Sequence, residues 1–530
     1  MLERKNRISR ALLQAIWILT LIAFAFVFLN GLFVSCRIDT LYSETNNERV
    51  VFVRNNPVLT AGLLLIFLAV LAGAGSVPIG KRTAGIGKIC LSVLVFGGAL
   101  FWMREAAAVP YADSRFCLEI ASLAASGSPV NLSDLSYLRL YPFQAGFVLY
   151  AEGMIRMLGD RALSGMQVLN AFWLVLLDLA VVEMAQQLFH RPRITLLAEI
   201  LLLLFAQPVF LATFIYGTIP GAAFGAAGMY ALIRFKQTDQ IGWGTAAAVL
   251  TGIAVLLKLN LAVAAIAGCM LIGIRMIRKP SWKGVAVLIL VAACALCFPA
   301  LAKIRYELLC GEKLGPGFPR SGHLLMGLSE SSMCSGWHNA NVPLAFINSG
   351  YNAETANAAY FREIDETLRY FLQRPRYLAS FFYHKLTSQW NTPSFQGIWS
   401  SSVSHDPERA GTFAQSMFYG AGAEISERFF LGITLLIYAG FALSLAIKTK
   451  EKECREEMTL IPLTLLGFFL YYALFEAKAQ YVILTVPTVI PLAAYAWIWA
   501  ADRVRVRIRR ETEPEDPVQE TGEKEEGSIA

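Results

Sequence analysis

The stretch WGTAAAVLTGIAVLLKLNLAVAAIAGCMLIGIR (residues 243–275) contains a single charged residue, Lys258, before it ends at Arg275. Its two halves, 243–258 and 260–275, approach the length that a helix needs to cross about 30 Å of hydrocarbon. Similar apolar blocks, mostly long enough to span a bilayer, recur along the whole chain of 530 residues. They lack the single apolar face that is typical of helices on a soluble domain. The stretch therefore predicts membrane-spanning helices.

The composition supports this interpretation. Of all residues, 56% are hydrophobic and only 16% are charged, whereas an average soluble domain has roughly 25% charged residues. This excludes a soluble enzyme, a disordered scaffold and a small secreted domain held together by disulfides. The net charge of +7 is better explained by basic cytoplasmic loops than by a nucleic-acid partner. We expect an all-α polytopic membrane protein.

The positions of the basic residues indicate a topology. Clusters of Lys and Arg precede the first span or follow every second one, so all of them fall on one side if both termini are cytoplasmic. The first apolar run is too long for a cleavable signal peptide. Twelve spans are expected at about 11–35, 57–76, 86–104, 163–188, 194–213, 217–234, 243–258, 260–275, 284–303, 427–447, 457–475 and 481–500.

Two long connections then lie outside the plasma membrane. The second is large enough for a small mixed extracytoplasmic domain, and Ala353–Gln373 within it has apolar residues at helical spacing. The acidic C-terminal tail is expected to be disordered. The predicted organisation is two additional N-terminal helices (1–85), a transmembrane core (86–303) with a first outer loop (105–162), an extracytoplasmic domain (304–426), C-terminal helices (427–510) and the tail (511–530).

The first outer loop holds the candidate chemistry. Asp113 follows the end of a span by a few residues, at the membrane surface where water-soluble and lipid-borne substrates can both be reached. Arg115 and Arg139 provide planar groups of donors that suit phosphate oxygens. Cys310 and Cys334 are both expected outside the membrane, where they could pair.

The order of motifs resembles the GT-C glycosyltransferases. Pro110-x-x-Asp113, then Tyr141-Pro142-x-Gln144-x-Gly146, is similar to the first outer loop of their family 39, the dolichyl-phosphate-mannose mannosyltransferase-like branch. Further matches, together covering roughly 86–500, are a helix ending in Lys258-Leu-Asn260, the segment Glu476-Ala-Lys478-Ala-Gln480-Tyr481, and the outer-domain motifs Met326-Gly-Leu, Gly336–Asn339 and Lys385-x-x-x-x-Trp390. Gln480 stands where many relatives have Arg.

The resemblance implies transfer of a sugar from a polyprenyl phosphate at the outer face, with inversion at the anomeric carbon. Asp113 would be the general base. Arg115, Arg139 and Lys258, in descending order, would stabilise the leaving phosphate. A glycan, lipid or protein of the cell envelope would be the acceptor, and no metal or other cofactor is favoured. The expected substrate-binding residues are Tyr141, Gln144, Asn260, Glu476, Lys478, Gln480 and Tyr481.

Two alternatives remain open. Twelve spans also fit a transporter or flippase of lipids or oligosaccharides, although such carriers usually have two similar halves and short outer loops. An envelope polysaccharide polymerase also has many spans and large outer loops, but it would transfer a whole repeat unit.

Overall fold

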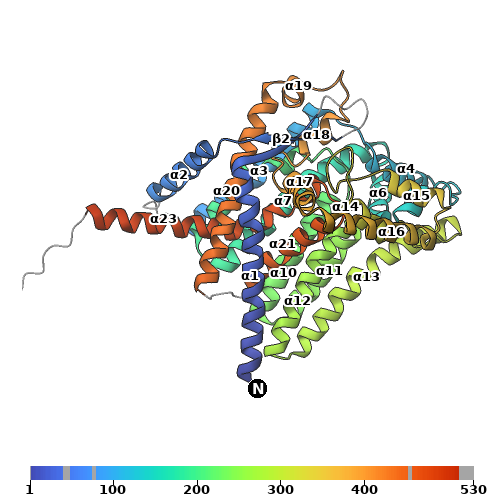
Figure 1. Ribbon diagram of the computed structural model, residues 1–530. Coiled ribbons are helices and arrows are strands. Elements are labelled where there is room, and N and C mark those ends of the chain that lie inside the picture. The colour runs from blue at the N-terminus through green and yellow to red at the C-terminus, as the bar shows by residue number, and fades with distance from the viewer. Residues whose placement is uncertain (1, 40–47, 75–78, 452–455, 513–530) are drawn as a thin grey trace, which may run out of the picture.

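The structure, a computed structural model, describes residues 2–39, 48–74, 79–451 and 456–512. Helices dominate it, as Figure 1 shows. The N-terminal end of α1 lies at the bottom of this view, and α18 and α19 lie at the top. The chain is a multi-pass membrane protein of all-α class, because nine helices in the described ranges are long and apolar enough to cross a bilayer.

A helix covers most of each of the twelve predicted spans. α11 and two others fall outside the nine that meet the length and apolarity required, so the number of twelve crossings stays a prediction. The twelve helices are α1 (Leu2–Phe33), α2 (Pro57–Ala74), α3 (Lys81–Ala106), α7 (Ala162–Phe189), α8 (Pro192–Leu204), α10 (Thr218–Thr238), α11 (Ile241–Leu257), α12 (Ala262–Arg278), α13 (Trp282–Cys310), α20 (Ala421–Glu451), α21 (Glu456–Leu474) and α23 (Ile490–Thr512).

The last helix begins later than the sequence predicts. The expected span 481–500 starts nine residues before α23, and the intervening chain forms α22 (Ala479–Val482) and the short 3-10 helix η5 (Val486–Val489). Pro487 lies at the start of η5, where the missing N–H of proline prevents a continuous α-helix. Tyr481 therefore lies in α22, before α23 begins. The predicted disordered tail falls almost entirely outside the described residues.

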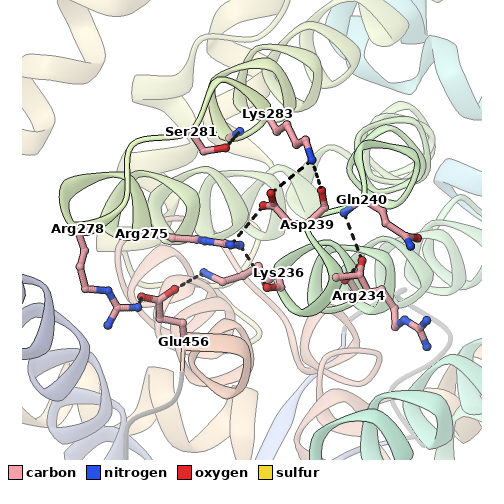
Figure 2. Close-up of polar contacts among 11 residues, drawn as sticks. Arg234, Lys236, Asp239, Gln240, Arg275, Arg278, Ser281, Lys283 and Glu456 are labelled. Atoms are coloured by element: carbon pink, nitrogen blue, oxygen red, sulfur yellow. Dashed lines mark hydrogen bonds and ion pairs between the residues drawn. The ribbon is translucent and has the colours of Figure 1, made fainter.

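Basic residues at the α10–α11 and α12–α13 connections meet around two carboxylates (Figure 2). Glu456, at the start of α21, pairs with Lys236 at 3.2 Å between Nζ and Oε2, and also with Arg278. Asp239, which ends α10, accepts from Arg275 and Lys283. The ends of α10 and α12 and the starts of α13 and α21 are thus joined by ion pairs. The side of the membrane on which they lie remains a prediction.

The two connections that are predicted to lie outside the membrane, named here the first and second outer connections, are joined to each other. The first contains α4 (Asp113–Ser126), α5 (Ser136–Leu140), the 3-10 helices η2 (Pro142–Gln144) and η3 (Gly159–Arg161), and α6 (Ala145–Leu158). Backbone hydrogen bonds join this connection to the second one, including Val109 N–H to Ser404 O at 2.9 Å and Asp406 N–H to Ala107 O at 3.1 Å.

The second connection is helical. The predicted helix Ala353–Gln373 is confirmed with the same bounds, as α16. The mixed character expected for 304–426 is limited to an isolated β-bridge between Ala108 and His405. The other helices are α14 (Arg320–Leu328), α15 (Asn341–Asn348), α17 (Pro375–Trp390), α18 (Gly397–Ser402) and α19 (Thr412–Tyr419), and the short α9 (Gln207–Phe210) lies between α8 and α10.

The N-terminal addition is built into the core. Trp17 of α1 donates to Thr459 of α21 at 2.9 Å, and the ring of Phe24 packs against Trp390 and Tyr438. A two-stranded antiparallel sheet that the sequence did not predict, β1 (Val34–Ile38) with β2 (Val50–Arg54), follows α1. Backbone hydrogen bonds from both strands reach the second outer connection.

Candidate active site

Asp113 begins helix α4 with an exposed carboxylate. The preceding residue, Ala112, has φ 48° and ψ −128°, a backbone conformation that is strained for any residue with a Cβ and that clusters at functional sites. The following residue, Ser114, is fully buried and donates its hydroxyl to the carbonyl of Ile215 at 2.6 Å. The start of α4 is therefore held against the segment that leads into α10.

Lys258 follows the last residue of α11 and precedes the 3-10 helix η4 (Leu259–Leu261), with which the candidate membrane span Leu259–Arg278 begins. Its Nζ lies 4.4 Å from the ring centroid of Tyr216 and 5.2 Å from that of Tyr481, which is cation–π geometry. It makes no ion pair with any residue in the described ranges. Burial lowers the pKa of Lys258 to about 8, although the nearby charges of Asp113 and Glu476 act to raise it.

A close approach of two backbones places Tyr216 beside Lys258. A Cβ on Gly217 would overlap the carbonyl oxygen of Leu257, the last residue of α11. Only glycine lets the chain before α10 come this near to the end of α11. The hydroxyl of the buried Tyr216 accepts a hydrogen bond from the side-chain amide of Gln144.

The segment after α21 contains four more of the predicted residues, Glu476, Lys478, Gln480 and Tyr481. Tyr481 donates its hydroxyl to the Glu476 carboxylate at 3.4 Å. Burial raises the pKa of Glu476, and the positive charge of Lys478 opposes this. Lys478 Nζ forms an ion pair with Glu48 Oε1 at 2.8 Å, and the two side chains are only 15% and 10% exposed.

Hydrogen bonds join this segment to the second outer connection, which contains the outer-domain motifs. The backbone N–H of Glu476 donates to His323 O at 3.0 Å, and that of Ala477 donates to Gly336 O at 3.3 Å. The fully buried Lys385 donates its ammonium to the carbonyls of Gly327, at 2.5 Å, and Phe475, at 3.0 Å. Burial lowers the pKa of Lys385 to about 7, with Glu476 acting to raise it.

Two further predicted residues lie at the edges of this group. Burial raises the pKa of the Tyr141 hydroxyl, and the negative charges of Asp113 and Glu476 add to that effect. Asn260 donates to the hydroxyl of Tyr472 at 3.4 Å, which in turn donates to the carbonyl of Tyr481 at 3.4 Å. We use the term site cluster for Asp113, Tyr141, Tyr216, Lys258, Glu476, Lys478 and Tyr481.

The two arginines ranked first for phosphate binding are engaged elsewhere. Arg115 pairs with Glu119 at 2.7 Å along the exposed face of α4, with side-chain exposures of 68% and 54%. The guanidinium of Arg139 lies 4.0 Å from the ring centroid of Tyr351. The ammonium of Lys258, ranked last, lies on the rings of Tyr216 and Tyr481, and the charge of Asp113 acts to raise its pKa.

Several contributors were missed by the sequence analysis. Glu48 comes from the N-terminal addition, and Tyr216 comes from the segment before α10. Gln396 donates to Glu48 at 3.0 Å and accepts from the backbone N–H of Gln480 at 3.2 Å. No local pattern identifies these residues, because their partners are distant in the sequence.

The described residues include free cysteines but no group of three or more possible metal ligands. Cys310 and Cys334, for which a pairing was left open, are both free thiols. Among the described residues, no three His, Cys, Asp or Glu side chains come together in a group that could hold a metal ion.

No model of a known protein family matches the chain, and no curated protein matches it. Among the solved structures that are similar to the chain, three share only 12–13% identity with it. The archaeal oligosaccharyltransferase AglB from Archaeoglobus fulgidus, in complex with an inhibitory peptide and a dolichol-phosphate, is 12% identical with a TM-score of 0.36 over 81% of this chain and 52% of that one. An oligosaccharyltransferase of the same organism, tethered with an acceptor peptide, is 13% identical with a TM-score of 0.39 over 81% and 51%.

The third is ArnT from Cupriavidus metallidurans bound to undecaprenyl phosphate, 13% identical with a TM-score of 0.32 over 79% of this chain and 78% of that one. The chain thus spans about half the length of the two oligosaccharyltransferase chains.

Proposed function

We propose that the chain is an integral-membrane glycosyltransferase of the GT-C type. It transfers a sugar from a polyprenyl-phosphate donor to a glycan, lipid or protein acceptor of the cell envelope, at the outer face of the membrane. The observation that supports this most directly is that the site cluster contains both a carboxylate and an ammonium group. An exposed carboxylate, Asp113, at a strained helix start lies near Lys258, a cation without an ion-pair partner in the described ranges.

The reaction needs one proton acceptor and one fixed cation. The Asp113 carboxylate takes the proton of the acceptor hydroxyl as its oxygen bonds to the anomeric carbon of the sugar. The bond from that carbon to the phosphate oxygen breaks, and both electrons leave with the polyprenyl phosphate. The Lys258 ammonium stabilises the negative charge that develops on this phosphate. A single displacement of this kind inverts the anomeric centre.

The aromatic and acidic neighbours have a supporting role. Tyr216 and Tyr481 face the Lys258 ammonium without neutralising it, so its charge stays available to a phosphate. Lys478 is already paired with Glu48, so it has less charge to offer. Glu476 and Tyr141 are placed to accept or donate hydrogen bonds to sugar hydroxyls.

The test uses the purified full-length protein in nanodiscs with radiolabelled polyprenyl-phosphate sugars. Asp113→Asn should keep donor binding and lose transfer by at least about a hundredfold. Asp134→Asn is the matched control, since Asp134 lies in the same outer loop and its carboxylate, within the described part of the chain, accepts only from the backbone N–H of Asn131, at 2.9 Å. Full transfer activity in Asp113→Asn contradicts the proposal.

Other outcomes would assign a different function. Vectorial movement of a labelled lipid without sugar transfer indicates a flippase, and products that grow by whole repeat units indicate a polymerase. We further propose that the transfer is independent of divalent metal. Loss of activity with a chelator and its return with Mg²⁺ or Mn²⁺ would disprove that part alone.

A further inference from the structure

Glu48 brings the N-terminal addition into contact with the site cluster. It lies two residues before β2, and its side chain is only 10% exposed. The strands β1 and β2 are fixed to the second outer connection by hydrogen bonds from Cys36 N–H to Asn391 O at 2.9 Å and from Val50 N–H to Met333 O at 3.2 Å. The position of Glu48 is therefore set by backbone contacts on both strands.

The Glu48 carboxylate uses both of its oxygens. Oε1 pairs with Lys478 Nζ at 2.8 Å, and Oε2 accepts from the side-chain amide of Gln396 at 3.0 Å. The carbonyl of that same amide accepts from the backbone N–H of Gln480 at 3.2 Å. Glu48 thus holds the Lys478–Gln480 segment at two points, once directly and once through Gln396.

The backbone at Gln396 is strained to make this contact. Phe395 and Gln396 have φ values of 46° and 63°, a left-handed conformation that is costly for residues other than glycine. Two such residues in succession persist only where the surrounding contacts outweigh the strain. Both side chains are fully buried, and the amide of Gln396 is turned to Glu48 and to Gln480.

The charges around Lys478 show why its partner matters. Burial acts to lower the pKa of Lys478, but Glu48 and then Glu476 outweigh it, so that the pKa is raised. Without Glu48, the buried ammonium would lose its ion-pair partner and its proton would be held less tightly. The titratable groups whose charges interact with Lys478 are Glu48, Glu476, Asp113, Lys258, His338 and Tyr111.

We propose that Glu48 is a positioning residue of the active site, supplied by the N-terminal addition. It holds Lys478 as a charged, ion-paired side chain and, through Gln396, fixes the segment that presents Glu476 and Tyr481 to Lys258. This rests on the proposed function for its effect on transfer. The two helices α1 and α2 and the strands between them then have a role in the site as well as in anchoring the protein.

The first measurement needs no substrate. Full-length protein in nanodiscs is treated at pH 9 with a short pulse of an amine-acetylating reagent, and acetylation of each lysine is measured by mass spectrometry. In Glu48→Gln, Lys478 should be acetylated about tenfold faster than in wild type, which corresponds to a fall of one pKa unit. Lys313, whose side chain is 84% exposed, should be acetylated equally in both proteins.

The matched control is Glu119→Gln, which removes an exposed carboxylate paired to Arg115 in the first outer connection. It should leave both the acetylation of Lys478 and the transfer rate unchanged. Glu48→Gln should lower kcat for sugar transfer by about ten- to a hundredfold, because a small displacement of positioned groups is costly. Glu48→Asp, which keeps the charge, should recover part of this loss.

A double variant covers the case in which Glu48→Gln does not fold. Glu48→Gln with Lys478→Gln removes both charges, so no buried ammonium is left unpaired, and its kcat should be no lower than that of either single variant. Equal acetylation of Lys478 in wild type and Glu48→Gln, or an unchanged kcat in an active Glu48→Gln, overturns the inference. Absence of sugar transfer in wild type refutes the proposed function instead, and acetylation still decides whether Glu48 holds Lys478.

Discussion

The ammonium of Lys258 lies over the ring of Tyr216, with 4.4 Å between Nζ and the ring centroid. A cation that rests on an aromatic face keeps its full charge, whereas one paired with a carboxylate is largely neutralised. This contact distinguishes Lys258 from Lys478, which is paired with Glu48 at 2.8 Å. Of the two lysines, Lys258 is the one suited to stabilise a departing phosphate.

The rate of transfer should therefore fall as the pH rises through about 8. Burial lowers the pKa of Lys258 to about 8, so the side chain is charged below that pH and loses its proton above it. In Lys258→Arg the alkaline fall should move to much higher pH, because arginine stays protonated. Initial rates between pH 6 and 10 test this, with Lys313→Arg as the exposed control. An alkaline limit that is the same in wild type and an active Lys258→Arg would contradict the assignment.

We expect substitution of Lys258 to reduce transfer more than substitution of Arg115, which reverses the order inferred from the sequence. Lys258→Gln should lower kcat by about a hundred- to a thousandfold, as is typical when a group that stabilises transition-state charge is removed. Arg115→Gln should lower it by less than about fivefold, because an exposed ion pair such as Arg115–Glu119 contributes little. Steady-state kinetics on both variants provide the comparison. A larger loss in Arg115→Gln would restore the original order.

Gly217→Ala should lower both stability and activity. The added methyl group would overlap the carbonyl of Leu257 and force apart the end of α11 and the segment holding Tyr216, at a cost of about 1–3 kcal/mol. Gly242→Ala is the control, since a Cβ at that position in α11 meets no atom within 4 Å. A thermal unfolding midpoint for Gly217→Ala equal to that of wild type would show that the approach is less close than described.

Much of the transmembrane architecture could be predicted because a bilayer leaves few choices. A chain in hydrocarbon must satisfy its backbone hydrogen bonds internally, so apolar blocks become helices. The helix Ala353–Gln373 was predicted with its bounds because its apolar residues recur at helical spacing. Its N-cap, Asn352, accepts from the backbone N–H of Glu354 at 3.0 Å.

The site could be predicted only in part, because its geometry depends on contacts between segments that are distant in the sequence. Asp113, Lys258 and Glu476 lie in recognisable segments, but their arrangement depends on contacts between distant parts of the chain. Glu48 and Lys478 are separated by 430 positions, and no periodicity or motif links them. The strands β1 and β2, five residues each, are too short to produce a clear alternating pattern. The backbone conformation of Gln396 likewise arises from tertiary contacts alone.

Lys385→Met should destabilise the protein and lower activity together, although Lys385 is not among the residues to which we assign a role in catalysis or binding. Its ammonium donates to the carbonyls of Gly327 and Phe475, and leaving each buried carbonyl without a donor costs about 1–3 kcal/mol. Phe475 directly precedes Glu476, so the loss also frees the segment that faces Lys258. The thermal midpoint and kcat should both fall, whereas Lys313→Met, at an 84% exposed side chain, should change neither. A variant that loses activity with an unchanged midpoint would instead indicate that Lys385 meets the substrate directly.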